Sequence, residues 1–520
     1  MARWTSPLPH RVLPFLERWQ PARQDVTPTQ WRWIGCGAGI VLAGSSWLCG
    51  ATPKELPSVW PGVIAWRPRV GGSPLAATAL FLAMAAMLYA WWALRDADLS
   101  VGWVQRTATA WFAPLLASAP LFSRDVYSYA VTGLQLLSGG DPYHQGVRHL
   151  VSPWVSSVSK VWLDTPAPYG PAFMLLTRVT ASAAQGHLLV AVALFRLTVV
   201  ASVVVIAWAI PATARALGTD PVKATWLTLL TPLVGAHLVA GIHNDGLMVA
   251  GMVASVALAL RRRHVWACLV LALAIAIKVP AVIAVPFVAL IVADHRTESQ
   301  GRTWWRLVRV AAVVGLGTVA AFVVLSLLSG LGFSWIAALN TPGASIQWTS
   351  LPTALGMGVG AIGTVFGHNV EHGAVTVLRD LALVALAATL IVLWLRAARE
   401  AHDSRAVVRY AGLAMLAVIV LSPAFHGWYL LWALPLLATT VDRRRWVTAL
   451  ALVASLMCVF VLPGGYGLAL VTTWVGVPLY FVATPVLVMR AVSWARSYAW
   501  GELFSLAGAG TRTHQPSRSA

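Results

Sequence analysis

Long runs of apolar residues, separated by short arginine-rich tracts, recur along almost the whole chain. A helix needs about 20 apolar residues to cross the hydrocarbon core of a bilayer, and fewer where neighbouring helices shield it. We therefore expect an all-α, polytopic membrane protein with about fourteen transmembrane helices. The predicted spans are residues 33–50, 75–94, 107–122, 187–211, 223–240, 245–260, 264–279, 281–293, 308–330, 374–396, 407–423, 427–441, 446–463 and 468–489.

The composition supports a membrane protein. Of the 520 residues, 58% are hydrophobic and 11% are charged, whereas a soluble domain carries about 25% charged residues. The net charge of +19 lies mainly in arginine tracts between the apolar runs, which is typical of membrane topology. We therefore expect membrane lipid around the chain and no nucleic-acid partner. The four cysteines are isolated within apolar segments, so no disulfide framework or cysteine metal site is expected.

The arginine tracts also predict the orientation of the chain, because cytoplasmic loops are rich in lysine and arginine. With the N-terminus inside, the basic tracts that fall in the cytoplasm are residues 261–264, 294–309, 396–405 and 442–445. This orientation requires residues 264–293 to make two short crossings. It also requires residues 171–184 to form a re-entrant or surface helix.

We accordingly divide the chain into three parts. Residues 1–32 form a cytoplasmic N-terminal tail, 33–490 a transmembrane domain, and 491–520 a basic cytoplasmic tail. The external face then carries two long loops with short helices, at about 123–186 and 331–373. Most residues with distinctive chemistry fall on this external side.

The first external loop begins with "SRDVYSY", in which Asp125 follows an apolar run. One interpretation is that Asp125 caps the helix that follows, because aspartate is a preferred N-cap residue. The other is that its carboxylate serves a reaction site, and the two roles are compatible. The loop also carries Arg124, Tyr127, Asp141 and Tyr169.

Three other external turns carry polar residues. His243, Asn244 and Asp245 stand at the start of a predicted helix, where capping is as plausible as a site role. Lys278 is a lone cation at a helix end, and it either snorkels to the surface or binds a phosphate there. His426 lies beside several aromatic residues, and a packing role is its simpler interpretation.

The sequence has no Gly-rich phosphate loop, no Gly-x-Ser-x-Gly motif and no metal-ligand helix motif. An external site has no access to cytoplasmic nucleotide sugars. An enzyme acting there needs a donor held in the membrane, and a polyprenyl-phosphate sugar meets this requirement.

Five segments in chain order resemble the actinobacterial polyprenol-phosphomannose-dependent α-1,6-mannopyranosyltransferases, membrane glycosyltransferases of the GT-C type. The resemblance covers most of the chain. The five segments are "LFSRDVYSYAVTGLQLLSGGDPYHQG", "SKVWLDTPAPYGPAFMLLTR", "HLVAGIHNDGLMVAGMV", "AIAIKVPAVIAVPF" and "LSPAFHGWYLLW".

The resemblance implies a GT-C fold and transfer of mannose from polyprenyl-phosphate mannose at the external face of the plasma membrane. The expected acceptor is a phosphatidylinositol mannoside or a mannan, and the expected product is the α-1,6-mannan of lipomannan and lipoarabinomannan in the cell envelope. No cofactor is expected, and the metal requirement stays open. The forms "DTPAPYGP" and "HLVAGIHND" favour the branch that initiates the backbone over the branch that extends it. The family usually has Glu where Asp245 stands.

The resemblance also implies residue roles. Asp125 matches the presumed catalytic base, and the expected reaction inverts a β-linked mannosyl phosphate. We expect Lys278, with Arg124 and His426 as weaker candidates, to bind the donor phosphate. We assign Tyr127, Asp141, Tyr169, His243, Asn244 and Asp245 to sugar or acceptor binding. The alternatives are a transporter or flippase for a lipid-linked sugar, and a GT-C transferase for another sugar.

Overall fold

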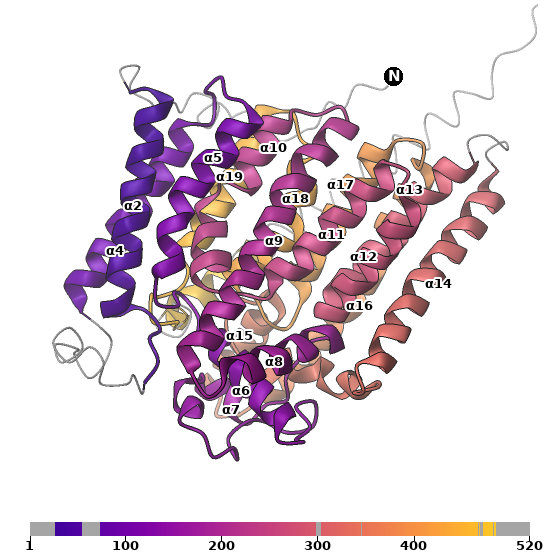
Figure 1. The fold of residues 1–520 in the computed structure, drawn as a ribbon. Helices are drawn as coiled ribbons and strands as arrows, with labels where there is room; N and C mark the ends of the chain where they lie inside the picture. The colour runs from indigo at the N-terminus through magenta and orange to yellow at the C-terminus, as the bar shows by residue number, and fades with distance from the viewer. Residues whose placement is uncertain are drawn as a thin grey trace, which may run out of the picture.

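The described chain is an all-helical bundle, as the apolar pattern predicts (Figure 1). The computed structural model describes residues 26–54, 73–297, 303–344, 346–465, 467, 472–481 and 483–484. Over these residues the one extended pairing is an isolated antiparallel bridge between Val461 and Gly467. The predicted tail 491–520 lies outside the described residues, as do most of the predicted tail 1–32 and part of the last predicted span, 468–489.

Six helical segments of the described chain are long and apolar enough to cross a membrane. They are α4 (Pro74–Ala93), α9 (Leu188–Ala216), the segment Val279–Arg296, α14 (Trp304–Leu328), α16 (Glu371–Arg399) and α17 (Ser404–Leu421). The bent pair formed by the π-helix η3 (Val234–Ala240) and α11 (Asp245–Leu260) makes a seventh if it is counted as one span. The chain is therefore a membrane protein, while the count of about fourteen crossings stays a prediction.

Several predicted spans are interrupted, and proline lies near each interruption. The predicted span 107–122 is split between α5 (Val101–Phe112) and the 3₁₀-helix η1 (Ala113–Ala117), with proline at positions 114 and 120. The predicted span 223–240 is likewise split into α10 (Pro221–Thr228) and η3, around Pro232. Proline lacks the backbone N–H and its ring clashes with the preceding turn of a helix, so regular α-helix is disfavoured at these points.

The longest interruption of this kind separates α12 from α13. Helix α12 (His264–Ile277) ends at Lys278, whose backbone is extended, and the 3₁₀-helix η4 (Val279–Ala284) and α13 (Val285–Thr297) follow. Pro280, at the start of η4, disfavours helical backbone in the residue before it. The break leaves Lys278 at the end of α12.

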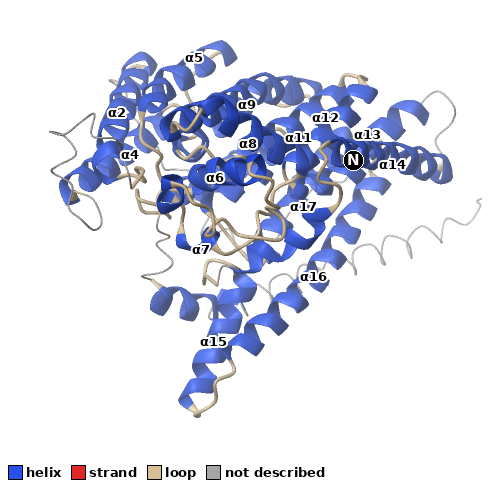
Figure 2. Cartoon of the chain, turned by 60° about the horizontal axis from the view of Figure 1, so that its bottom comes forward, coloured by secondary structure: helices blue, strands red, loops and turns tan. Residues whose placement is uncertain are grey.

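Helices α6 (Asp125–Leu137), α7 (Lys160–Leu163) and α8 (Pro171–Ala184) lie together at one end of the bundle (Figures 1 and 2). They belong to the first predicted external loop, together with the 3₁₀-helix η2 (Pro153–Ser157). Helix α8 packs against α6, and Gly133 permits the close approach because a Cβ there would lie 2.2 Å from the Thr177 carbonyl oxygen. Helix α8 is not among the segments long and apolar enough to span a membrane.

Gly170, at the start of α8, joins this layer to the bundle. Its N–H donates to the carbonyl of Ile277 at 2.9 Å, and a Cβ would lie 2.3 Å from the Ala276 carbonyl oxygen. This contact places Tyr169, the preceding residue, beside the end of α12 and therefore beside Lys278.

The remaining helices complete the bundle. Helix α2 (Pro28–Cys49) packs on α4, and α19 (Arg444–Cys458) follows the 3₁₀-helix η7 (Gly427–Tyr429) and α18 (Leu430–Ala438). The second predicted external loop contains the 3₁₀-helix η6 (Ser334–Ala344) and α15 (Leu351–Val365), which packs on α16. Figure 2 shows α15 extending away from α6 and α8 along α16.

Candidate active site

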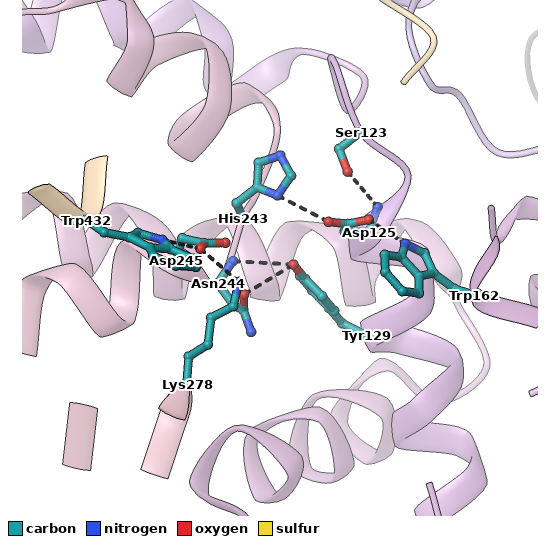
Figure 3. A network of polar contacts seen from close by, with 9 residues as sticks. All are labelled: Ser123, Asp125, Tyr129, Trp162, His243, Asn244, Asp245, Lys278 and Trp432. Carbon is teal, nitrogen blue, oxygen red and sulfur yellow. Dashed lines mark hydrogen bonds and ion pairs between the residues drawn. The ribbon is translucent and has the colours of Figure 1, made fainter. Parts of the chain in front are cut away.

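Asp125 is the first residue of α6, but its carboxylate does not serve as the helix cap. The N-cap position is Arg124, which makes no side-chain capping hydrogen bond. The Asp125 backbone N–H donates to the Ser123 hydroxyl at 3.0 Å. The Asp125 carboxylate instead contacts side chains from other segments of the chain (Figure 3).

Two ring nitrogens lie against the Asp125 carboxylate. Trp162 donates its indole N–H to Oδ1 at 3.0 Å, and His243 Nδ1 lies 3.4 Å from Oδ2. Burial alone would raise the pKa of the Asp125 carboxyl, but His243, His426 and Trp162 together lower it to about 2. The side chain keeps 15% of its surface exposed. Asp125 is therefore an ionised carboxylate at neutral pH, with a small opening to the surroundings.

Asp245 is the second carboxylate of the site and is almost fully buried. It begins α11, and the N-cap residue Asn244 makes no side-chain capping hydrogen bond. Asp245 Oδ1 accepts from Lys278 Nζ at 2.8 Å and from the Trp432 indole N–H at 2.6 Å. Asp245 therefore does not cap α11 but forms a buried ion pair that joins α11 to the end of α12 (Figure 3).

Lys278 points into the site rather than snorkelling to the surface. Its side chain is 12% exposed, and its ammonium lies 5.3 Å from the ring centre of Tyr429 and 5.4 Å from that of Trp432. The Tyr169 ring is 6.0 Å away. A desolvated ammonium is stabilised by aromatic faces as well as by its carboxylate partner. The snorkelling interpretation of Lys278 is therefore wrong.

Trp428 stacks with two of the site histidines. Its ring centre lies 3.8 Å from that of His243 and 4.5 Å from that of His426. Burial lowers the pKa of His426 to about 4, and the neighbouring His243 and Lys278 add to this effect while Asp125 and Asp245 oppose it. His426 is thus a neutral imidazole at pH 7, which weakens the expectation that it binds phosphate as a cation.

We expect the stability of the protein to fall as the pH drops from 6.5 towards 4. In this window the unfolded chain protonates His426 while the folded chain does not, because its pKa is lowered from 6.5 to about 4. Thermal unfolding in detergent, measured across this range, should show the decline. His426→Phe should flatten it, and an unchanged pH slope in this variant would contradict the lowered pKa.

Tyr129 connects the two halves of the site. Its hydroxyl lies 3.5 Å from both the side-chain Oδ1 and the backbone N of Asn244, which precedes Asp245 (Figure 3). Its ring makes an edge contact with Tyr169 at 5.3 Å. Burial raises the pKa of the Tyr169 phenol, and the Asp125 and Asp245 carboxylates raise it further, whereas the hydrogen bond with Tyr129 lowers it. The pKa is raised on balance, so the phenol stays protonated. The side-chain Nδ2 of Asn244 is buried and has no hydrogen-bond partner among the residues that the structure describes.

Three predicted site residues lie apart from this network. Arg124 donates to the carbonyls of Ser157 at 3.0 Å and Thr52 at 3.2 Å, so its guanidinium joins loop segments. Tyr127 is fully buried and its hydroxyl donates to the carbonyl of Ala51. Asp141 is 46% exposed and accepts from the Tyr143 backbone N–H and from His144.

The structure also adds residues that the sequence did not single out. Trp162, Tyr129 and Trp432 each contact a group of the site through a side-chain hydrogen bond. Trp162 stands in one of the five quoted segments, three residues before "TPAPYGP", but nothing in its spacing links it to Asp125. The contacts join residues 37 to 187 positions apart, which no local pattern reveals.

The site brings together an ionised base, a buried ammonium and several aromatic faces. Among the described residues, no three His, Cys, Asp or Glu side chains are grouped so that they could hold a metal ion. The arrangement is suited to taking a proton from a hydroxyl with Asp125 while a cation stands near by. Of the predicted site residues, the structure brings together Asp125, Tyr169, His243, Asn244, Asp245, Lys278 and His426.

Two family models match the chain. An α-(1→6)-mannopyranosyltransferase N-terminal domain matches residues 32–294, and an MptB C-terminal domain matches residues 352–493. The α-(1→6)-mannopyranosyltransferase A of Mycobacterium tuberculosis is 31% identical over 83% of this chain and 84% of its own length. The α-(1→6)-mannopyranosyltransferase B of Corynebacterium glutamicum is 29% identical over 75% of this chain and 67% of its own length. No solved structure matches the chain.

Proposed function

This chain belongs to the α-(1→6)-mannopyranosyltransferase family, and we propose that it transfers mannose from a polyprenyl-phosphate mannose to the 6-hydroxyl of a mannoside. The observation that carries the proposal is the ionised Asp125 carboxylate beside the Lys278 and Asp245 pair, at the end of a membrane bundle. A donor anchored in the membrane reaches such a position without a nucleotide-binding site.

Asp125 acts as the general base in this proposal. The acceptor O6 forms a bond to C1 of the donor mannose, the bond between C1 and the phosphate oxygen breaks, and Asp125 takes the proton from O6. A primary hydroxyl is a weak nucleophile at neutral pH, and a positioned base contributes about 10²–10⁴-fold. Because attack and departure occur on opposite faces of C1, a β-linked donor gives an α-linked product.

Trp162 and His243 hold the base in position. The Trp162 N–H binds Oδ1 at 3.0 Å and His243 lies 3.4 Å from Oδ2, so both carboxylate oxygens have a fixed neighbour. Their contacts favour the ionised carboxylate and lower its pKa. We therefore move His243 from the sugar-binding role suggested by the sequence to the support of Asp125.

Lys278 is the cation that we propose for the leaving phosphate, whose negative charge grows as the bond to C1 breaks. An ammonium has three donors, and Asp245 accepts from one of them at 2.8 Å. Asp245 thereby orients the ammonium, while Arg124 is engaged with backbone carbonyls and His426 is neutral at pH 7. The polyprenyl phosphate leaves with the electron pair of the broken bond.

Sugar hydroxyls are proposed to bind where unpaired donors and aromatic faces meet. Within the described part of the chain, the buried Nδ2 of Asn244 has no hydrogen-bond partner, and the protonated phenol of Tyr169 lies next to Lys278. Asp141 is exposed in the same external loop, where an incoming acceptor chain would pass. Aromatic faces suit the apolar side of a pyranose ring.

The external location, the phosphatidylinositol mannoside or mannan acceptor, and the lipomannan product are part of this proposal. They rest on the arginine tracts and on the family resemblance. The length of the acceptor decides between the initiating and the extending branch. We propose the initiating branch, from "DTPAPYGP" and "HLVAGIHND".

The deciding experiment uses the purified full chain in detergent with labelled polyprenyl-phosphate mannose and short α-mannosides. We expect a product one mannose longer, joined through an α-1,6 bond, and no product from a nucleotide sugar. Mannosides of increasing length separate the initiating from the extending branch. Movement of donor across a vesicle without product would identify a flippase, and product from another prenyl-phosphate sugar alone would correct the sugar.

A further inference from the structure

Asp125 and Asp245 follow two turns with the same backbone irregularity. Phe122 lies three residues before Asp125 and has a φ of 61°, and Ile242 lies three residues before Asp245 and has a φ of 56°. A positive φ is unfavourable for a bulky residue and is a genuine outlier for β-branched isoleucine. Such conformations persist only where the surrounding structure determines them. The position of each carboxylate therefore depends on a strained turn, and contacts with the surrounding structure must stabilise that turn.

The two turns are bonded to each other through their backbones. The N–H of Leu121, next to Phe122, donates to the carbonyl of Ala240, two residues before Ile242, at 3.2 Å. Both Phe122 and Ile242 are buried, with 1% and 0% of their surface exposed. A shift of one turn is therefore transmitted to the other.

Arg196 reaches the helix end that leads into each of these turns. It comes from α9, is 7% exposed, and donates from Nη1 to the carbonyl of Leu116 at 2.8 Å and from Nε to the carbonyl of Val239 at 3.2 Å. Leu116 lies in the last turn of η1, and Val239 in the last turn of η3. Carbonyls at helix ends lack partners within the helix and carry partial negative charge, which a guanidinium satisfies.

We propose that Arg196 is a positioning residue that fixes the two turns before Asp125 and Asp245 relative to each other. The importance of this relative position for transfer rests on the proposed function, in which Asp125 and the ion pair of Lys278 and Asp245 must face the same substrate. The planar guanidinium presents several donors in a fixed fork, so one side chain bridges two carbonyls. The compact ammonium of a lysine does not reproduce this geometry.

The test compares Arg196→Met and Arg196→Lys with a matched control, Arg405→Met. Arg405 also donates to a backbone carbonyl, from Nε and Nη2 to that of Thr440 at 3.0 and 2.8 Å, in the connection between α18 and α19, and it pairs with Asp442 as well. The purified full chains are assayed for kcat and KM. Hydrogen exchange is followed in peptides covering residues 118–124 and 241–247.

We expect Arg196→Met to lower kcat by about 100-fold with KM within about 3-fold, because small displacements of reacting groups have effects of this size. Amide exchange should rise in both peptides together. Arg196→Lys should show the same changes in smaller measure. Arg405→Met should keep kcat and leave exchange in the two peptides unchanged.

Hydrogen exchange makes the inference independent of activity. If the wild-type chain transfers no mannose, the proposed function fails, and joint loosening of the two peptides still decides the role of Arg196. Unchanged exchange in both peptides would overturn the inference, and so would an equal loss of kcat in Arg405→Met. If Arg196→Met does not accumulate as a folded protein, Arg196→Lys decides, and wild-type kcat and exchange in that variant would refute the role.

Discussion

Asp125→Asn should reduce mannose transfer by about 10²–10⁴-fold, the contribution expected of a positioned general base. The amide has nearly the same size as the carboxylate, and its oxygen can still accept from the Trp162 N–H. What the variant loses is the ability to take the proton from the acceptor hydroxyl. The measurement is the steady-state rate of mannoside extension by purified protein at saturating donor, with thermal unfolding as the test of folding.

The matched control is Asp164→Asn, which removes a carboxylate from the same external segment. Asp164 pairs with Arg148, and its side chain is 60% exposed. This variant should keep the wild-type rate, because a surface ion pair contributes little to stability. A folded Asp125→Asn protein that transfers mannose at the wild-type rate would remove Asp125 from the mechanism.

Local signals in the sequence were sufficient to predict that Asp125 stands at the start of a helix, whereas its catalytic role stays a prediction. Asp125 follows an apolar run after Ser123 and Arg124, and the sequence predicted the start of a helix there. The same reasoning found Asp245 at the start of α11. It did not find the partners of these carboxylates, because Trp162 and Trp432 lie 37 and 187 positions away.

The helices were predicted more accurately than their crossings. The uninterrupted apolar segments 187–211, 308–330 and 374–396 correspond to α9, α14 and α16, each extended by a few residues. Predicted spans that contain prolines were split into separate helices, such as α10 and η3 on either side of Pro232. Helix η3 then meets α11 at a bend of 114°. Hydropathy shows which segments are apolar, but it does not show how the chain bends at a proline. That path depends on packing and on which groups bind the backbone carbonyls that the break leaves without a partner.

Lys278 shows the limit of local patterns most clearly. No acid stands near it in the sequence, so snorkelling and phosphate binding remained as the two interpretations. The structure pairs it with Asp245, 33 positions away, and surrounds it with aromatic rings. A buried ion pair depends on the fold as a whole, and its partners need no sequence proximity.

Lys278→Met should both destabilise the protein and abolish efficient use of the lipid donor. The substitution leaves Asp245, which is 1% exposed, without its ammonium. Removing one member of a buried ion pair costs about 3–5 kcal/mol, because the remaining charge is buried and unpaired. Thermal unfolding in detergent measures the first effect. The dependence of transfer rate on donor concentration measures the second.

The double variant Asp245→Asn with Lys278→Met separates these two effects. Without the carboxylate no buried charge is left unpaired, so the double variant should recover much of the stability lost by Lys278→Met. Donor use should not recover, because the cation proposed for the leaving phosphate is still missing. Recovery of both stability and transfer would mean that the pair only supports the fold. In that case the phosphate charge must be stabilised by another group, and Lys278 would lose its proposed role in the reaction.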